Sequence, residues 1–299
     1  MKKILIADAL DKEAVDLLQA VPGFEVTVKT GLDEAALIQT VPGFNAVVVR
    51  SATKITKPVI DASSGLQIVV RAGIGLDNVD SAAAKAKGVA VANTPSATTI
   101  SVAEYTFGLM LAAVRQQGRA NVTMKQHKWE KKALHGTELY GKTLGLVGAG
   151  RIGLAVAERA LAFGMSVLAY DVIPIKTALA VDQVPLNDLL AAADVITLHV
   201  PKMPGALIGP AEFARMKDGV ILINAARGGV VDEAALLAAL NSGKVRAAAL
   251  DVWAKEPPED WTLIDHPNVT AAPHIASQAA EGQKRAGLEV VRILKDKLA

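Results

Sequence analysis

The sequence predicts an α/β protein built from two doubly wound parallel-sheet domains. The first observation behind this is an alternation along the whole chain, in which short runs rich in β-branched residues are separated by amphipathic helical stretches. Such alternation is typical of parallel strands covered by helices on both faces. The second observation is length, since 299 residues, 51% of them hydrophobic, suffice for about two domains with separate cores.

The first series of predicted strands occupies about the first ninety residues, at 3–8, 24–29, 45–50, 67–71 and 89–93. Helical patterns at 12–20 and 34–40 each end before a Pro-Gly pair, and such pairs mark turns. A second series of strands follows at 143–147, 166–170, 195–199, 220–224, 247–250 and 269–271. Helical patterns such as 152–163 and 232–241 separate these strands.

A last helical pattern at 279–298 is too long to end the second sheet alone, so we expect it to cross back to the first domain. The predicted domains are therefore 1–95 plus 280–299, and 96–279. Between the two series, an apolar helix and an amphipathic arm occupy about 99–135. This segment is typical of a subunit interface, and the alternative is an interdomain helix in a monomer.

Composition excludes several classes of protein. A net charge of +2 gives no basic surface for nucleic acid. The absence of cysteine excludes disulfides, thiolate catalysis and cysteine-ligated zinc, and we predict no metal site. The chain has neither a signal-peptide apolar region at its start nor the roughly 20 uninterrupted apolar residues of a membrane helix. We expect a soluble cytoplasmic protein without nucleic-acid or membrane partners.

The most specific motif is GAGRIG at 148–153, which follows a predicted strand and opens a predicted helix. Gly148 permits a tight turn, Gly150 lets a pyrophosphate approach the backbone, and Gly153 lets the helix pack on the strand. The helix N-terminus offers free N–H groups to the phosphates. Asp171, after the next strand, suits a ribose hydroxyl and favours NAD over NADP. The motif predicts a dinucleotide-binding domain.

Ligands of open α/β sheets bind beyond the carboxyl ends of the strands. Residues suited to ligands follow the strands of the second series: Asp171, His199-Val200-Pro201, Ala225-Ala226-Arg227, Asp251 and Pro273-His274. In the first series Arg50 and Arg71 close two strands, and Gly73-Ile74-Gly75 follows. We interpret these residues as an anion site, although each arginine alone could be a solvated surface charge.

Arg227, Glu256 and His274 are the side chains that hydride transfer from a 2-hydroxy acid requires. A histidine can take the hydroxyl proton because its pKa lies near neutral pH. A carboxylate can fix its tautomer and stabilise its charged form. An arginine can bind the substrate carboxylate with two parallel N–H donors. Each residue alone has an ordinary structural explanation, but their combination with the dinucleotide motif favours catalysis.

Long motifs identify the chain as resembling the D-isomer-specific 2-hydroxyacid dehydrogenase family, and most closely its phosphoglycerate-oxidising members. VVVRSATKIT, RAGIGLDNVD, GKTLGLVGAGRIG, INAARGGVVDEAALLAAL and HPNVTAAPHI occur here in the family's order. The resemblance implies a Rossmann NAD-binding domain inserted in a flavodoxin-like substrate-binding domain. It also implies a homodimer, NAD as cofactor, and a small phosphorylated 2-hydroxy acid as substrate.

By this resemblance the catalytic residues are Arg227, Glu256 and His274. The implied cofactor-binding residues are Gly148, Gly150, Arg151, Ile152, Gly153, Asp171, His199, Val200, Pro201, Ala225, Ala226, Arg227, Asp251, His274 and Ala276. The implied substrate-binding residues are Arg50, Ser51, Arg71, Gly73, Ile74, Gly75, Lys131, Arg227 and His274. Lys131 and its neighbour Lys132 fall where the family places basic residues near a phosphate, including that of a neighbouring subunit.

The chain departs from the family in several places. The loops after Asp171 and His199 are shorter than usual, Ile74 replaces a frequent threonine, and Ala276 stands where glycine is usual. The chain also lacks the C-terminal serine-sensing domain of longer relatives, so we expect no feedback inhibition through such a domain.

We expect NAD-dependent oxidation of D-3-phosphoglycerate to 3-phosphooxypyruvate, the entry step of serine biosynthesis. One alternative is a reductase of glycerate-type substrates such as hydroxypyruvate or glyoxylate. Another is a dimeric NAD(H)-sensing module that has kept its catalytic residues.

Overall fold

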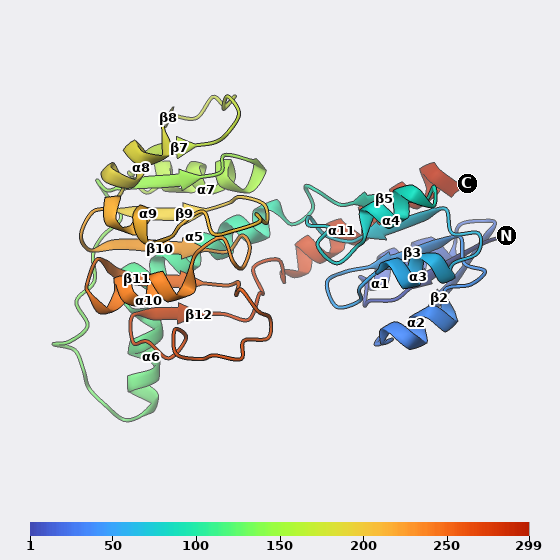
Figure 1. Cartoon of the computed structure of the whole chain (residues 1–299), viewed down its shortest axis with the longest axis horizontal. Coiled ribbons are helices and arrows are strands. Elements are labelled where there is room, and N and C mark those ends of the chain that lie inside the picture. The colour runs from blue at the N-terminus through green and yellow to red at the C-terminus, as the bar shows by residue number, and fades with distance from the viewer. Residues whose placement is uncertain (299) are drawn as a thin grey trace. The chain divides into compact units, whose positions relative to one another are not determined.

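The computed structural model describes residues 1–298, which form two compact units (Figure 1). The first unit contains Met1–Thr99 and the chain from Gln278 onward, and the second contains Ile100–Ser277. Ala299, the last residue of the expected first domain, lies outside the described residues. Each unit contains a parallel sheet with its own helices, which confirms the predicted fold class.

The sheet of the first unit has the order β2-β1-β3-β4-β5. Its strands are β1 (Lys2–Ile6), β2 (Phe24–Val28), β3 (Ala46–Val49), β4 (Ile68–Arg71) and β5 (Ala90–Asn93). Its helices are α1 (Lys12–Gln19), α2 (Glu34–Thr40), α3 (Lys57–Ala62), α4 (Ser81–Ala86) and α11 (Ala280–Leu298). Val49 pairs with Arg71 in register, so β3 and β4 end side by side and bring Arg50 next to Arg71.

Both faces of this sheet are buried. Ile4 and Ile6 lie in one apolar cluster with Leu18 of α1, whereas Leu5 lies in a second cluster with Ile60 of α3. This division follows from the strand geometry, because successive side chains point to opposite faces. A sheet covered on both faces explains why its strands are near-continuous apolar runs in the sequence.

Helix α11 comes last in the chain but belongs to the first unit, where it packs on α1 and on β4. A Cβ atom at Gly287 of α11 would lie only 2.7 Å from the Cβ of Ala14 on α1. The missing side chain therefore lets the two helices approach closely. Val290 and Leu294 of α11 are fully buried in the same cluster as β1.

The sheet of the second unit has the order β12-β11-β10-β9-β6-β7-β8. Its strands are β6 (Thr143–Val147), β7 (Ser166–Tyr170), β8 (Val181–Gln183), β9 (Val195–Leu198), β10 (Val220–Asn224), β11 (Val245–Leu250) and β12 (Val269–Ala271). Its helices are α5 (Thr99–Arg115), α6 (Gln117–Lys125), α7 (Arg151–Ala162), α8 (Leu186–Ala192), α9 (Pro210–Arg215) and α10 (Glu233–Asn241). The short strand β8 was not predicted.

The strand order of this sheet reverses at β6, which pairs with β7 on one side and with β9 on the other. Helices that follow β6 and β9 therefore leave the sheet on different faces, and a crevice forms where they separate. The loop that begins at Gly148 and the residues from His199 onward lie at this switch point. The fold thus directs the glycine motif to the position where such sheets bind ligands.

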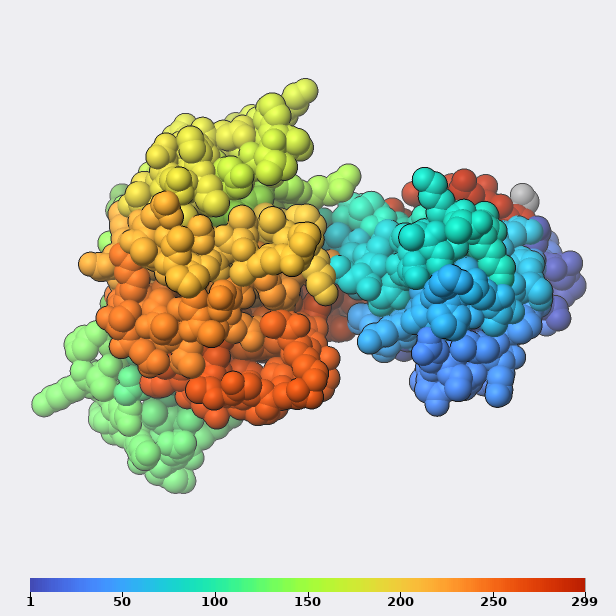
Figure 2. Space-filling model, viewed as in Figure 1, coloured from blue at the N-terminus to red at the C-terminus, as the bar shows by residue number. Residues whose placement is uncertain are grey.

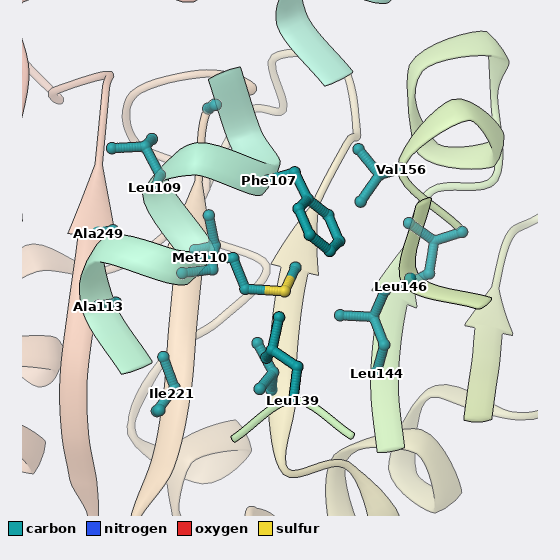
Figure 3. Packing of buried hydrophobic residues seen from close by; sticks show 14 of the residues in the cluster. Phe107, Leu109, Met110, Ala113, Leu139, Leu144, Leu146, Val156, Ile221 and Ala249 are labelled. Atoms are coloured by element: carbon teal, nitrogen blue, oxygen red, sulfur yellow. The ribbon is translucent and has the colours of Figure 1, made fainter. Parts of the chain in front are cut away.

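Helix α5 is a core helix of its own unit. Figure 3 shows Phe107 and Met110 of α5 packed over Leu144, Leu146 and Ile221 of the sheet. Phe107 also contacts the ring of Phe163, with 4.7 Å between the ring centroids. The broadly apolar character of this helix, interpreted above as an interface signal, is explained to a large part by burial within the unit.

The exposed apolar residues of this region lie in the arm after α5, which we define as 117–140. Val122, Met124, Trp129 and Tyr140 are all more than half exposed. In Figure 2 this green segment projects from the body of the second unit. The arm begins after Gln116, whose left-handed backbone (φ 52°) separates α6 from α5.

Within residues 1–298, none of the helices is long and apolar enough to cross a membrane. These residues also contain no group of three or more His, Cys, Asp or Glu side chains arranged to hold a metal ion.

Two adjacent leucines of α1 provide a test of this packing. Leu18→Ala removes a fully buried side chain and should lower the free energy of unfolding of the first unit by about 2–5 kcal/mol. Leu17→Ala removes a side chain that is 42% exposed and should change it by about 0.5 kcal/mol or less. Urea unfolding followed by circular dichroism measures both, and equal effects would contradict the predicted burial.

Candidate active site

The glycine motif forms a tight loop between β6 and α7. Gly148 has a φ of 95°, and a Cβ atom there would lie 2.6 Å from the carbonyl oxygen of His199. A Cβ atom at Gly153 would lie 2.2 Å from the carbonyl oxygen of Gly148. Side chains at these two positions would push the loop away from β9 and α7 away from the loop. Both glycines are therefore required by the fold itself.

Gly150 differs from its two partners. A Cβ atom there would meet no other atom within 4 Å, although the residue is the N-cap of α7. The first N–H groups of a helix have no partner inside the helix and attract anions. Open space beside such groups fits a pyrophosphate, because the phosphate oxygens can approach the backbone without meeting a side chain. Arg151 and Ile152 begin the helix at the same place.

Asp171 directly follows β7 and faces this loop. Its Oδ2 accepts a hydrogen bond of 2.8 Å from the backbone N–H of Ala149, and its Oδ1 accepts one of 3.3 Å from Ile173. The carboxylate is thereby held beside the glycine loop with lone pairs left for ribose hydroxyls. Its negative charge disfavours the extra phosphate of NADP.

Gln183 of β8 holds the segment after Asp171 and was missed by the sequence analysis. Its Nε2 donates to the carbonyl oxygens of Asp171 (3.3 Å) and Ile173 (3.0 Å), and its Oε1 accepts from the N–H of Ile175 (2.9 Å). Three hydrogen bonds made by one side chain order this loop. A polar residue in a three-residue edge strand gave no signal in the sequence.

His199 follows β9 and lies at the switch point, but it is unsuited to acid–base work. Its Nε2 lies 3.0 Å from Oγ1 of Thr197. Burial lowers the pKa of His199 to about 4, so the imidazole is uncharged at neutral pH. Its role beside Val200 and Pro201 in cofactor binding stays a prediction.

Arg227 is carried by a turn after β10 that a buried asparagine shapes. Asn224 is 2% exposed; its Oδ1 accepts from the N–H of Ala226 (3.0 Å), and its Nδ2 donates to the carbonyl oxygen of Arg227 (3.1 Å). A Cβ atom at Gly228 would lie 1.7 Å from the carbonyl oxygen of Trp253, so this turn lies directly against the segment after β11.

Glu256 and His274 form the pair that the sequence predicted. The Nδ1 of His274 lies 2.8 Å from Oε2 of Glu256, and Oε1 of Glu256 accepts a 3.1 Å hydrogen bond from the N–H of Trp253. The two side chains are 45% and 38% exposed, so a ligand can reach Nε2 of the imidazole. The carboxylate selects the tautomer with a proton on Nδ1, which leaves the lone pair of Nε2 free to accept a proton.

The pKa values of this pair move apart. The hydrogen bond that His274 donates to Glu256 raises the pKa of His274, although burial opposes it, and the charges of Glu256 and Asp251 add to the increase. Burial alone would raise the pKa of Glu256. The hydrogen bonds from His274 and Trp253 and the charges of His274 and Arg227 outweigh burial and lower it. The carboxylate therefore stays ionised while the imidazole titrates, as an acid–base residue must.

The pair borders a cavity of about 500 Å³ within the second unit. The remaining lining residues are mostly apolar: Trp253, Pro257, Pro258, Trp261, Ile264, Ala271, Ala272 and Pro273. Apolar walls beside the carboxylate strengthen its interaction with the imidazole, because they keep water away from one side of the pair.

Ala276, which replaces the usual glycine, fits without strain. Among the described residues other than glycine, only Gln116, His127 and His274 have positive φ, so Ala276 adopts an ordinary backbone conformation. Its side chain is buried in the apolar cluster beneath α5. The departure from the family pattern therefore imposes no backbone cost here.

The predicted anion residues of the first unit lie on two adjacent loops. The backbone N–H of Arg50 donates to Oδ2 of the buried Asp8 (2.6 Å), and the Nη2 of Arg50 donates to Oε1 of Gln278 (3.1 Å). The Nε of Arg71 and the Nδ2 of Asn78 both donate to the carbonyl oxygen of Arg50, at 3.3 Å and 2.8 Å. Two guanidinium groups are thus held at one edge of the sheet.

The structure gives less information on the roles of the other predicted substrate residues. Gly73 and Ile74 are held by β5, since the carbonyl of Gly73 accepts from Thr94 (3.0 Å) and that of Ile74 from Asn93. Ser51 is exposed, and Gly75 lies on the same turn as Ile74. Lys131 and Lys132 are exposed on the arm, and their role near a phosphate stays a prediction.

Comparison with known proteins identifies the family of this site. The family model described as "D-isomer specific 2-hydroxyacid dehydrogenase, NAD binding domain" matches residues 107–276. The chain belongs to the D-isomer-specific 2-hydroxyacid dehydrogenase family. Its second unit is accordingly the NAD-binding part of this family's fold, and NAD is its cofactor.

Two relatives within this family are about equally similar to the chain. A hydroxypyruvate reductase of Thermotoga maritima is 49% identical over 98% of both chains. A D-3-phosphoglycerate dehydrogenase of Archaeoglobus fulgidus is 48% identical over 96% of this chain, but the match spans only 55% of that longer protein. The crystal structure of the TT0316 protein of Thermus thermophilus superimposes with a TM-score of 0.89 at 36% identity, over 97% and 94% of the two chains.

Glycine positions 150 and 153 separate cofactor binding from folding in this dehydrogenase. Gly150→Ala should raise the Kd for NADH about tenfold, because the methyl group occupies the open space that we assign to the pyrophosphate, while the unfolding temperature stays unchanged. Gly153→Ala should lower both affinity and unfolding temperature, since its Cβ meets the Gly148 carbonyl. Fluorescence titration and thermal unfolding measure these effects, and full NADH affinity in Gly150→Ala would contradict the assignment.

Proposed function

We propose that this protein oxidises D-3-phosphoglycerate to 3-phosphooxypyruvate with NAD, as part of serine biosynthesis. The observation that carries the proposal is the hydrogen-bonded pair of His274 and Glu256, placed with Arg227 at the strand ends of an NAD-binding sheet. This set provides an acid–base group, its partner carboxylate and a fixed cation. Such a set has no use in a protein that only binds NAD(H).

In the proposed mechanism Arg227 binds the substrate carboxylate and polarises the oxygen on C2. Nε2 of His274 removes the hydroxyl proton, while Nδ1 stays hydrogen-bonded to Glu256, whose charge stabilises the imidazolium that forms. NAD, when bound, supplies the acceptor for the hydride from C2. In the reverse direction the imidazolium returns the proton to the carbonyl oxygen, so His274 must be protonated for ketone reduction.

The choice of a phosphorylated substrate is supported by the first unit. Arg50 and Arg71 are held side by side, and two guanidinium groups on adjacent loops suit a dianionic phosphate. The 48% identity to a phosphoglycerate dehydrogenase supports the same choice. We assign these arginines to the phosphate.

A second candidate is reduction of hydroxypyruvate. The chain spans 98% of the hydroxypyruvate reductase that it matches but about half the length of the phosphoglycerate dehydrogenases. In this case the chemistry of Arg227, Glu256 and His274 is the same. The difference is confined to the absence of a phosphate from the substrate.

We also propose that the arm at 117–140 pairs with a second copy of the chain. Its exposed Val122, Met124 and Trp129 form an apolar surface that a homodimer would bury. Light scattering that gave the mass of a single chain at micromolar concentration would contradict this proposal.

Initial rates of NADH formation with D-3-phosphoglycerate and with D-glycerate test the substrate directly. We expect kcat/KM to be about 100-fold higher for the phosphorylated acid, because D-glycerate lacks the group that pairs with both arginines. Arg50→Gln should reduce kcat/KM more for the phosphorylated acid than for D-glycerate. The reverse reaction is measured with 3-phosphooxypyruvate, hydroxypyruvate, glyoxylate and NADH.

Each contrary result has a distinct meaning. Turnover of unphosphorylated acids alone would select the hydroxypyruvate reductase candidate and remove the phosphate role of Arg50 and Arg71. No turnover with any of these acids, together with tight NADH binding, would overturn the enzymatic proposal and favour an NAD(H)-sensing module.

Glu256→Gln should change the pH dependence of turnover. Ketone reduction needs protonated His274, and its kcat/KM falls as pH rises through the pKa of His274. Because Glu256 raises that pKa, its neutral replacement lowers it, and the fall in reduction moves to lower pH. For hydroxy-acid oxidation, the rise with pH also moves to lower pH, and kcat should drop about 100-fold.

The matched control for this change is Glu259→Gln, which alters an exposed carboxylate three residues away and should leave both profiles in place. Unshifted profiles in Glu256→Gln would show that Glu256 does not act on His274.

A further inference from the structure

We infer that Asp251 is a positioning residue that holds His274 in its reactive orientation through the backbone of the residues that follow it. This inference rests on the proposed function in one respect, since it takes His274 as the acid–base residue. It differs from the family-based expectation, in which Asp251 contacts the cofactor.

The geometry of Asp251 carries the inference. The residue directly follows β11 and is 0% exposed. Its Oδ1 accepts a 2.8 Å hydrogen bond from the N–H of Ile275, and its Oδ2 accepts one of 2.8 Å from the N–H of Ala276. Both donors come immediately after His274. A single buried carboxylate therefore fixes the backbone on the C-terminal side of the histidine.

The backbone of His274 needs such support. Its φ of 56° lies in the left-handed region, which residues with a Cβ atom adopt rarely. Conformations of this kind persist only where the surroundings hold them, and they are frequent at active sites. The two hydrogen bonds that Asp251 accepts come from the N–H groups of the next two residues, so they oppose relaxation of His274 to an ordinary conformation.

Two carboxylates thus orient the imidazole of His274, each through a different contact. Glu256 binds the ring at Nδ1, whereas Asp251 binds the chain that carries the ring. Asp251 is itself anchored, because its own N–H donates to the carbonyl oxygen of Asn224 at 2.9 Å. Asn224 also shapes the turn of Arg227, so the positions of the base and of the substrate-binding arginine are linked through Asp251.

The charge of Asp251 is costly in this place, which indicates that it is used. Burial raises the pKa of Asp251, and its two N–H partners and the charge of His274 oppose that rise, whereas the charge of Glu256 adds to it. Burial raises the pKa of Tyr105 on α5, and the charge of Asp251 adds to this increase. The observed turn presents two N–H donors and therefore requires two acceptor oxygens, which a carboxylate offers. An amide has only one acceptor oxygen and cannot replace it.

Asp251→Asn tests the inference in the full-length chain. Asparagine has the same size but offers one acceptor oxygen, and its NH2 group would face the other N–H. We expect kcat to fall about 100-fold, the loss typical of a displacement of about 1 Å in a reacting group. The Kd for NADH should change less than about twofold. Asp265→Asn, the same change at an exposed position of the second unit, should alter neither value.

A double-mutant cycle separates positioning from a general structural effect. If Asp251 acts through His274, Asp251→Asn should reduce kcat in the wild type but cause no further loss in a His274→Ala background. Equal fold-losses in both backgrounds would overturn the inference. A tenfold or greater rise in the NADH Kd of Asp251→Asn would also overturn it, in favour of direct cofactor contact.

Two further controls keep the test decisive. If Asp251→Asn fails to fold by circular dichroism, Asp251→Glu keeps the charge but displaces the oxygens by one methylene, and it should still lose more than about 90% of kcat. Full activity of Asp251→Glu would contradict the inference. Wild-type turnover is measured first, since its absence with every acid would overturn the proposed function, whereas full activity of Asp251→Asn in an active enzyme overturns only the role of Asp251.

Discussion

Side-chain oxygens that accept backbone N–H groups shape every loop on which the site depends. Asp8 accepts from Arg50, Asp171 from Ala149, Asn224 from Ala226, and Asp251 from Ile275 and Ala276. In a parallel sheet the chain leaves each strand at the same edge, and its N–H groups lose their ladder partners there. A carboxylate or amide at the last residue of a strand or one or two residues beyond it satisfies these groups and fixes the turn. The cations and the histidine are then presented from rigid backbone.

Electrostatics in the second unit follow from this arrangement. Because the carboxylates of Asp251 and Glu256 are engaged by N–H donors, they remain available as fixed negative charges beside His274. The two carboxylates raise the pKa of His274, and the positive charge of Arg227 opposes this increase. The same charge lowers the pKa of Glu256 and so stabilises its ionised form. His199 follows β9 in the same sheet, and its partner is the neutral hydroxyl of Thr197. Burial lowers its pKa, so it stays uncharged. Burial at His199 and the partner carboxylate at His274, rather than the net charge of the chain, set the protonation of these two histidines.

The sequence was a good guide where the signal is local. Strands such as β3 and β10 are continuous apolar runs, and the glycine motif requires its residue types within six positions, so both could be predicted from the printed chain. The interactions that complete the site join distant residues: Asp251 reaches across 24 positions to Ile275, and Arg50 across 42 to Asp8. Contacts of this kind leave no periodic pattern. The left-handed backbone of His274 was equally invisible, because no local pattern in the sequence predicts it.

The discontinuity of the first unit bears on the order in which the chain acquires its structure during synthesis. Residues of the second unit are contiguous, so that unit has all its strands and helices once its last segment leaves the ribosome. The first unit, although it is translated first, lacks the helix that covers α1 and one face of β1 until α11 has been made. Ile4, Ile6 and Leu18 therefore lack this cover while the whole second unit is synthesised. Apolar surface that is exposed during synthesis favours aggregation, so the late position of α11 makes the folding of the first unit depend on a segment made after the second unit.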